Sequence, residues 1–79
     1  MDGRPKLTFT GIVARISPPK EGRTNSTATV EYLGGTSFVS IPPAQLGKIE
    51  EGHQYTFQTS TYVKDGGFRA GDLLGVKAA

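Results

Sequence analysis

Two short basic segments contain the residues best suited to binding chemistry. They span residues 17–25 and 64–71, are rich in turn-forming Pro, Gly, Asn and Asp, and each joins two runs of strand-forming residues. The cations on which a ligand would depend are Lys20, Arg23, Lys64 and Arg69. Paired cations on turns can neutralise the phosphates of a nucleic acid, or they can serve only as solubilising charges. The two segments therefore indicate an anion-binding surface if the fold brings them together.

Residues that could support catalysis or hold a metal do not form a recognisable constellation. The chain has no cysteine, and its one histidine, His53, follows a turn glycine and has no partner suited to a metal. Glu50 and Glu51 are adjacent, so they do not face each other as an acid–base pair would. The paired glycines match neither a dinucleotide-binding pattern nor a P-loop. We therefore expect no catalytic residues, no metal and no cofactor, and hence no enzymatic activity.

The charge of the chain is weakly basic and unevenly distributed. The formal net charge is +2 and the isoelectric point about 9.2. The cationic excess lies in the first quarter and the last fifth of the chain, whereas acidic residues gather near residue 50, which favours a polyanionic partner. No apolar stretch is long enough for a membrane span, and the N-terminus lacks the apolar region of a signal peptide. We expect a cytoplasmic protein, associated with the nucleoid if it binds DNA.

The residue pattern predicts an all-β domain of five strands. Thr, Val, Ile, Tyr and Phe occur in short runs between Gly and Pro clusters, and good helix formers are sparse. The parity of the apolar residues in the first run changes near Gly11, which predicts a bulge or bend. The expected single domain covers 1–79 with an ordered core over about 7–77, strands over 7–17, 26–33, 36–41, 53–64 and 72–77, and a helical turn over 43–49.

Alternation along the strands predicts which side chains face the core. Val39 and Ile41 share one face of the third run, so Phe38 points outward. The positions expected outside the core, on a strand face or in a loop, are Arg15, Phe38, Tyr62 and Phe68. The positions expected inside it include Tyr32, Tyr55, Phe57, Leu74 and Val76.

The order of the elements resembles the OB fold, in which three strands and a short helical connector precede two further strands. The glycine-bent first run over 9–16 agrees with it, as does the fourth run, where Gly52 is followed by Tyr55 and Phe57. Over about residues 7–77 the chain is similar to the small OB-fold proteins that bind single-stranded nucleic acid, a class that includes the bacterial single-stranded DNA-binding proteins and the domains of replication protein A. An SH3-like barrel is the alternative architecture.

This resemblance implies that the first and last hairpin loops lie on either side of one ligand groove. The function it implies is binding of single-stranded DNA, without sequence specificity, by aromatic stacking and phosphate contacts. An RNA-binding OB domain is one alternative, and a protein-interaction or structural β-barrel is another. Further expected partners are a second copy of the chain or a protein of replication or repair. The residues expected to contact the strand are Arg15, Lys20, Arg23, Phe38, Tyr62, Lys64, Phe68 and Arg69.

Overall fold

Strands form here because β-branched and aromatic residues occur in short runs, most of which end at glycine or proline. The computed structural model describes residues 5–79. The expected domain covers residues 1–79, and its first four residues lie outside the described part. The elements of the described part are β1 (Leu7–Ser17), β2 (Ser26–Tyr32), β3 (Gly35–Ile41), α1 (Pro43–Leu46), β4 (Gln54–Lys64) and β5 (Gly67–Ala78).

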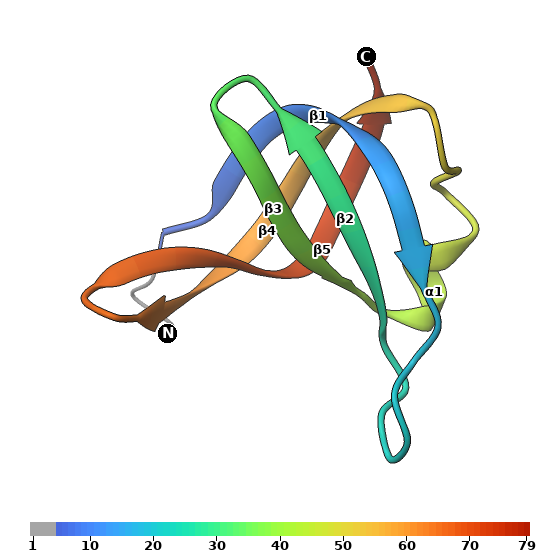
Figure 1. Ribbon diagram of the computed structural model, residues 1–79, viewed down its shortest axis with the longest axis horizontal. Helices are drawn as coiled ribbons and strands as arrows, with labels where there is room; N and C mark the ends of the chain where they lie inside the picture. The colour runs from blue at the N-terminus through green and yellow to red at the C-terminus, as the bar shows by residue number, and fades with distance from the viewer. Residues whose placement is uncertain (1–4) are drawn as a thin grey trace.

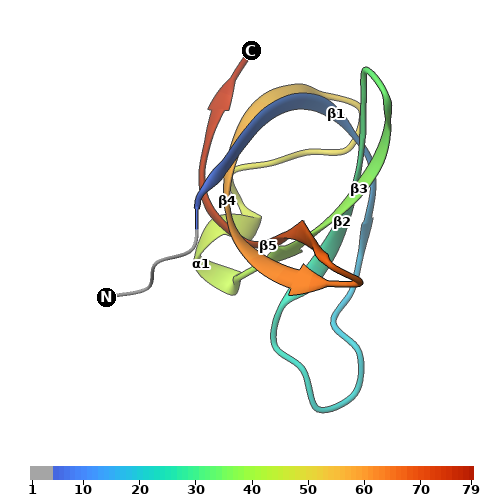
Figure 2. The same ribbon diagram turned by 90° about the vertical axis from the view of Figure 1, so that its left-hand side faces the viewer.

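The five strands close into a barrel in the order β1-β2-β3-β5-β4 (Figure 1). Neighbouring strands are antiparallel except β3 and β5, which run parallel and meet at one pair, Ser40 and Asp72. The predicted five-stranded barrel with a helical turn between the third and fourth strands is confirmed, and the architecture is that of an OB fold. α1 lies against β5 at one end of the barrel (Figure 2), where the Gln45 side-chain amide donates to the Leu74 carbonyl at 3.2 Å. Within residues 5–79 no helix has the length and hydropathy that a membrane crossing requires.

β1 belongs to both halves of the barrel because it changes partner near its middle. Its residues up to Ile12 pair with β4, and those from Ile12 onward pair with β2. The pairing with β2 skips Ala14, and this extra residue moves the inward positions from Val13 to Ile16. The predicted phase change near Gly11 is confirmed.

The core is small and consists mainly of aliphatic side chains. Phe57 is fully buried, as predicted, whereas Tyr55 is only half-buried and packs against the core. Phe38 is exposed, whereas Val39 and Ile41 are buried, as the alternation along β3 predicts. The buried apolar residues are Val13, Ala28, Val30, Val39, Ile41, Ile49, Phe57, Ala70 and Leu73.

The prediction of a loop over residues 64–71 is wrong. β4 continues to Lys64 and β5 begins at Gly67, so the connection is a two-residue turn of Asp65 and Gly66. Both turn residues have positive φ, 54° and 79°, which matches the twist of the flanking strands and makes Asp-Gly a favoured hairpin turn. Phe68 and Arg69 are therefore strand residues.

The prediction that Leu74 faces the core is also wrong. Leu74 is 43% exposed, while Leu73 is only 2% exposed and belongs to the core. Gln58 of β4 pairs with Gly75 and Thr59 pairs with Leu73, so Leu74 is an extra residue in β5. A single extra residue reverses the alternation of side chains, which is why Leu73 and Val76, three apart, both pack inward.

Replacing Gly11 with alanine should destabilise the barrel. A methyl group on Gly11 would lie 2.6 Å from Val30 Cγ1 and 2.7 Å from the Glu31 carbonyl oxygen, so β1 and β2 would have to separate. We expect Gly11→Ala to lower the free energy of unfolding in urea by about 1–3 kcal/mol. Gly75→Ala, where the methyl group meets nothing within 4 Å, should change it by less than about 0.5 kcal/mol. Equal stabilities of the two variants would contradict the packing.

Candidate functional site

The β4–β5 hairpin extends beyond the barrel and forms the first of two arms (Figure 1). Thr61 and Ala70 are the last buried pair, and residues 62–69, here called the hairpin arm, are exposed. Tyr62 pairs with Arg69, so their side chains lie on the same face of the arm, and Lys64 follows two residues later on that face. The hairpin arm thus presents an aromatic ring between two cations.

The β1–β2 connection, residues 18–25, forms the second arm, which is here called the loop arm (Figure 1). The Arg23 amide donates to the Lys20 carbonyl at 2.9 Å, and Gly22 has a φ of 78°, so Lys20 and Arg23 stand at the two ends of one tight turn. The Asn25 side-chain amide donates to Ser40 Oγ at 3.0 Å and ties the base of the loop arm to β3. These contacts hold both cations on the side of the barrel that β3 occupies.

A hollow of about 420 Å³, the aromatic hollow, lies between the hairpin arm and β3. Four of the seven aromatic residues line it and are partly exposed: Phe38 by 65%, and Phe68, Tyr62 and Tyr32 by 57%, 43% and 39%. It is lined by Leu7, Tyr32, Thr36, Ser37, Phe38, Tyr62, Lys64, Asp65, Phe68, Arg69 and Ala70. Exposed rings that gather in one concavity are typical of a binding surface.

The prediction that Tyr32 belongs to the core is wrong. It is the last residue of β2 and pairs with Gly35 beside the hairpin turn, beyond the packed interior. Its ring packs against Phe9, with centroids 5.6 Å apart, and part of it faces the aromatic hollow. Tyr32 lies on the same face of β2 as the buried Val30, but the packed interior of the barrel ends before Tyr32. The strand end next to a glycine turn is the sequence feature that could have identified it.

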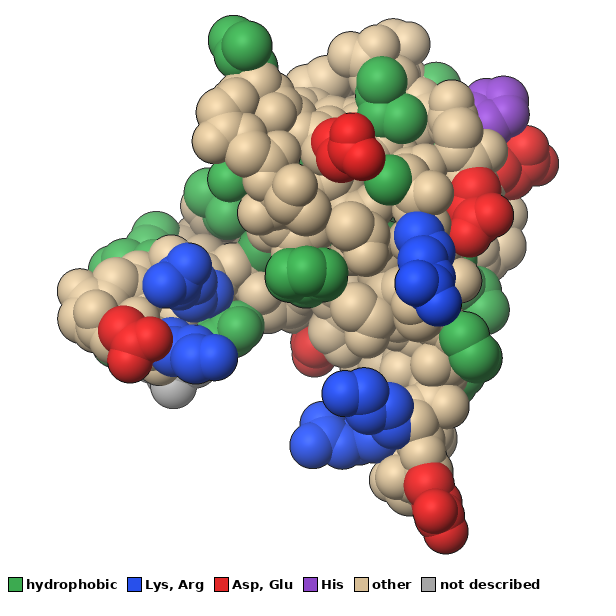
Figure 3. Space-filling model, in the orientation of Figure 1, with side chains coloured by type: hydrophobic (Ala, Val, Ile, Leu, Met, Phe, Trp, Pro, Cys, Tyr) green, Lys and Arg blue, Asp and Glu red, His purple; other side chains and the backbone are tan. Residues whose placement is uncertain are grey.

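A second hollow of about 470 Å³, the polar hollow, lies between the loop arm and the β3–β5 junction. It has no aromatic lining and consists of Lys20, Gly22, Arg23, Thr24, Asn25, Thr27, Ser40 and Asp72. Phe38 in the aromatic hollow and Ser40 in the polar hollow are two residues apart on the same face of β3, so the hollows adjoin. Together they form one groove, and Figure 3 shows cationic side chains gathered on both arms that flank it.

Two predicted site residues occupy positions other than those expected. Tyr62 was expected on an outward strand face of the barrel, but it lies beyond the barrel on the hairpin arm and forms part of the wall of the aromatic hollow. Arg15 lines neither hollow; it pairs with Thr29, which pairs with Phe38, so the three side chains form a row across the outer face of the sheet. A ligand that extends over this face from Phe38 toward β1 would therefore pass Arg15.

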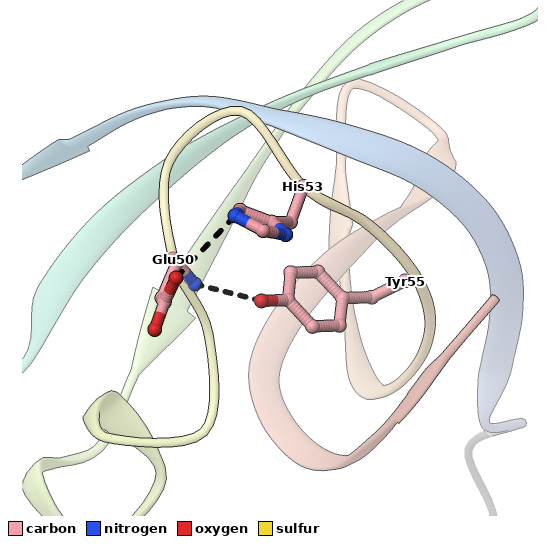
Figure 4. Close-up of polar contacts among 3 residues, drawn as sticks. All are labelled: Glu50, His53 and Tyr55. Carbon is pink, nitrogen blue, oxygen red and sulfur yellow. Dashed lines mark hydrogen bonds and ion pairs between the residues drawn. The ribbon is translucent and has the colours of Figure 1, made fainter.

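A separate polar cluster occupies the connection before β4 (Figure 4). His53 Nε2 lies 3.3 Å from a carboxylate oxygen of Glu50, and both side chains are largely exposed. The Tyr55 hydroxyl accepts a hydrogen bond of 2.9 Å from the Glu50 amide. This arrangement stabilises the turn and supplies only two metal-ligating side chains, and no group of three such ligands occurs within residues 5–79. None of the three residues of this cluster lines either hollow.

Comparisons with known proteins support the fold. No protein-family model and no curated protein matches the sequence. A chain from the structure of a replication protein A heterotrimer bound to ssDNA superimposes with a TM-score of 0.69 and 18% sequence identity. The match covers 94% of the present chain but only 57% of that chain, so the present chain spans a little more than half of its length. At this level of identity the similarity concerns the OB fold.

The exposure of Phe38 predicts that its ring contributes little to stability. Phe38→Ala should change the free energy of unfolding by about 0.5 kcal/mol or less, because most of the ring is already in water. Phe57→Ala, which empties the centre of the core, should cost about 3–5 kcal/mol. Urea unfolding of the two variants measures the difference. A large loss in Phe38→Ala would show that the ring supports the barrel.

Proposed function

We propose that the protein binds single-stranded nucleic acid, DNA in the first place, in the groove formed by the two hollows. The observation that carries the proposal is the aromatic hollow, which is lined by four partly exposed rings and one pair of cations, while a second pair of cations lines the adjoining polar hollow. Proteins that bind single strands combine stacking platforms with a positively charged groove in this way. The similarity to a chain from an ssDNA-bound heterotrimer supports the proposal through the fold.

The aromatic hollow suits bases that are not paired. Phe38 lies on the β2–β3 sheet, and Tyr62 lies on the opposing hairpin arm. Phe68 pairs with Val63 and so belongs to the other face of the arm, but it also contributes to the lining of the hollow. An unpaired base can stack on such a ring with either face, and the gain is about 1–3 kcal/mol for each base. Bases inside a duplex already stack on their neighbours and expose only their edges, so the hollow favours single strands over duplexes.

The arms suit the phosphates of the same strand. Lys20 and Arg23 stand on the loop arm, and Lys64 and Arg69 on the hairpin arm, so cations line both parts of the groove. The two carboxylates that line the groove, Asp65 and Asp72, leave an excess of two positive charges along it. Binding should therefore release counterions and weaken as salt increases. In this proposal the protein is a binding module without catalytic chemistry.

Fluorescence anisotropy with labelled oligonucleotides tests the proposal. We expect a single-stranded DNA of about 12 nucleotides, within the range of about 4–16 that one OB fold covers, to bind with micromolar or tighter affinity at low salt. A single-stranded RNA of the same sequence measures the role of the 2′-hydroxyl, and a duplex should bind more weakly. Phe38→Ala should weaken single-strand binding about 5- to 150-fold, as the loss of one stacked base implies. Leu33→Ala is the control, since Leu33 is fully exposed and lines neither hollow.

Two results would contradict the proposal. One is no change in anisotropy at low salt with any of the three ligands. The other is equal affinity of Phe38→Ala and the unaltered protein, which would leave the aromatic hollow without a role in binding. Sedimentation that shows a salt-insensitive dimer with Phe38 protected would instead favour a protein-interaction module.

The salt dependence of binding should identify the cations that contact phosphates. The double variant Lys20→Gln and Arg23→Gln should reduce the slope of log Kd against log salt by about 0.7 for each lost phosphate contact. Lys48→Gln with Lys77→Gln removes the same charge from a different hollow, lined also by Thr8 and Gln58. This control should leave the slope unchanged. Equal slopes in the two double variants would show that only net charge matters.

A further inference from the structure

Among residues 5–79, Asp72 carries the one carboxylate that lines the polar hollow, whose other lining residues are cationic or neutral. It lines the polar hollow, on the same wall as Ser40, the β3 residue with which it pairs. Its amide donates to Ser60 Oγ at 2.9 Å, so the backbone that carries the carboxylate is held by β4 as well as by β3. The backbone at Asp72 therefore belongs to the sheet and not to a loose loop.

The carboxylate of Asp72 is free to interact with a ligand. The side chain is exposed, and within residues 5–79 it forms no ion pair or side-chain hydrogen bond. The lysine and arginine of the loop arm line the same hollow without pairing with it. An ionised carboxylate only accepts hydrogen bonds, so it repels a phosphate oxygen and attracts an N–H donor.

The bases of a nucleic acid differ in whether they present an exocyclic amino group as the donor. Cytosine, adenine and guanine carry an exocyclic amino group, and carboxylates accept hydrogen bonds from the cytosine N4 amino group in known complexes. Thymine and uracil carry a carbonyl oxygen at the position that corresponds to N4 of cytosine. Their one N–H donor on this edge, N3–H, lies between two carbonyl oxygens, which repel a carboxylate that approaches it. A base that enters the polar hollow beside Asp72 is therefore favoured if it carries an amino group.

We propose that Asp72 is a specificity-determining residue that makes the polar hollow prefer amino-bearing bases over thymine and uracil. This inference rests on the proposed binding of single strands in the groove. It gives the two hollows different functions. The aromatic hollow binds any base by stacking on the face of the base, and the polar hollow discriminates between bases by hydrogen bonding to the edge of one base. The phosphates follow the cations of the arms, away from the carboxylate.

The test compares two single-stranded DNA probes of 12 nucleotides, oligodeoxycytidylate and oligodeoxyuridylate, at low salt and without divalent cations. Their bases are pyrimidines of the same size that differ at the edge where cytosine has its amino group. We expect the unaltered protein to bind the cytidylate at least about fivefold more tightly, as one base-edge contact implies. Asp72→Asn, which keeps the shape and the backbone contacts, should bring the ratio of their Kd values close to one, because an amide side chain both donates and accepts hydrogen bonds.

Asp65→Asn is the matched control. Asp65 lines the aromatic hollow and has a φ of 54°, a conformation that asparagine also tolerates, so the variant makes the same change of charge without strain. It should leave the ratio of Kd values as in the unaltered protein. An unchanged ratio in Asp72→Asn, an equal fall in both variants, or a preference that appears only with Mg²⁺ would overturn the inference. Failure of both probes to bind the unaltered protein would instead refute the proposed function.

Discussion

The pairing of β1 with two strands is the constraint on which the rest of the structure depends. β4 and β2 lie on opposite sides of β1, and the barrel closes because one continuous strand changes partner at Ile12. Gly11 allows the close approach to Val30 that this change requires, and the extra residue at Ala14 restores the inward alternation. The loop arm begins where β1 ends, so the course of β1 also determines where Lys20 and Arg23 are displayed.

The contact between β3 and β5 explains why the groove exists. The two strands meet only at Ser40 and Asp72, and above this pair the hairpin arm diverges from β3. The aromatic hollow occupies the resulting opening, and the polar hollow adjoins the junction itself. A chain of this size has few aromatic residues for its core, yet four of seven line the opening and only Phe57 is fully buried. Exposure of the rings is thus a specific property of the groove and not of the surface in general.

The sequence alone predicted the positions of side chains correctly where local alternation and the tertiary fold agree. The outward position of Phe38 followed from Val39 and Ile41, which share the buried face of β3, and the bend in β1 followed from a glycine and a change of parity. The errors arose where geometry depends on a partner strand. The extra residue at Leu74 is defined only by the pairing of β5 with β4, and the exposure of Tyr32 only by where the barrel ends. The Asp65–Gly66 turn was a local signal that a longer loop assignment obscured.

The same division of β1 between two partners gives the barrel pairings of two kinds, between neighbouring segments and between distant ones. β1, β2 and β3 are consecutive antiparallel strands, so their contacts form between neighbouring segments. The pairing of Leu7 with Thr59 joins residues far apart in the chain, and such contacts form slowly because a long loop must first close. β1, β2 and β3 are synthesised before β4, so the meander of three strands lacks its largest buried side chain, Phe57, until β4 follows.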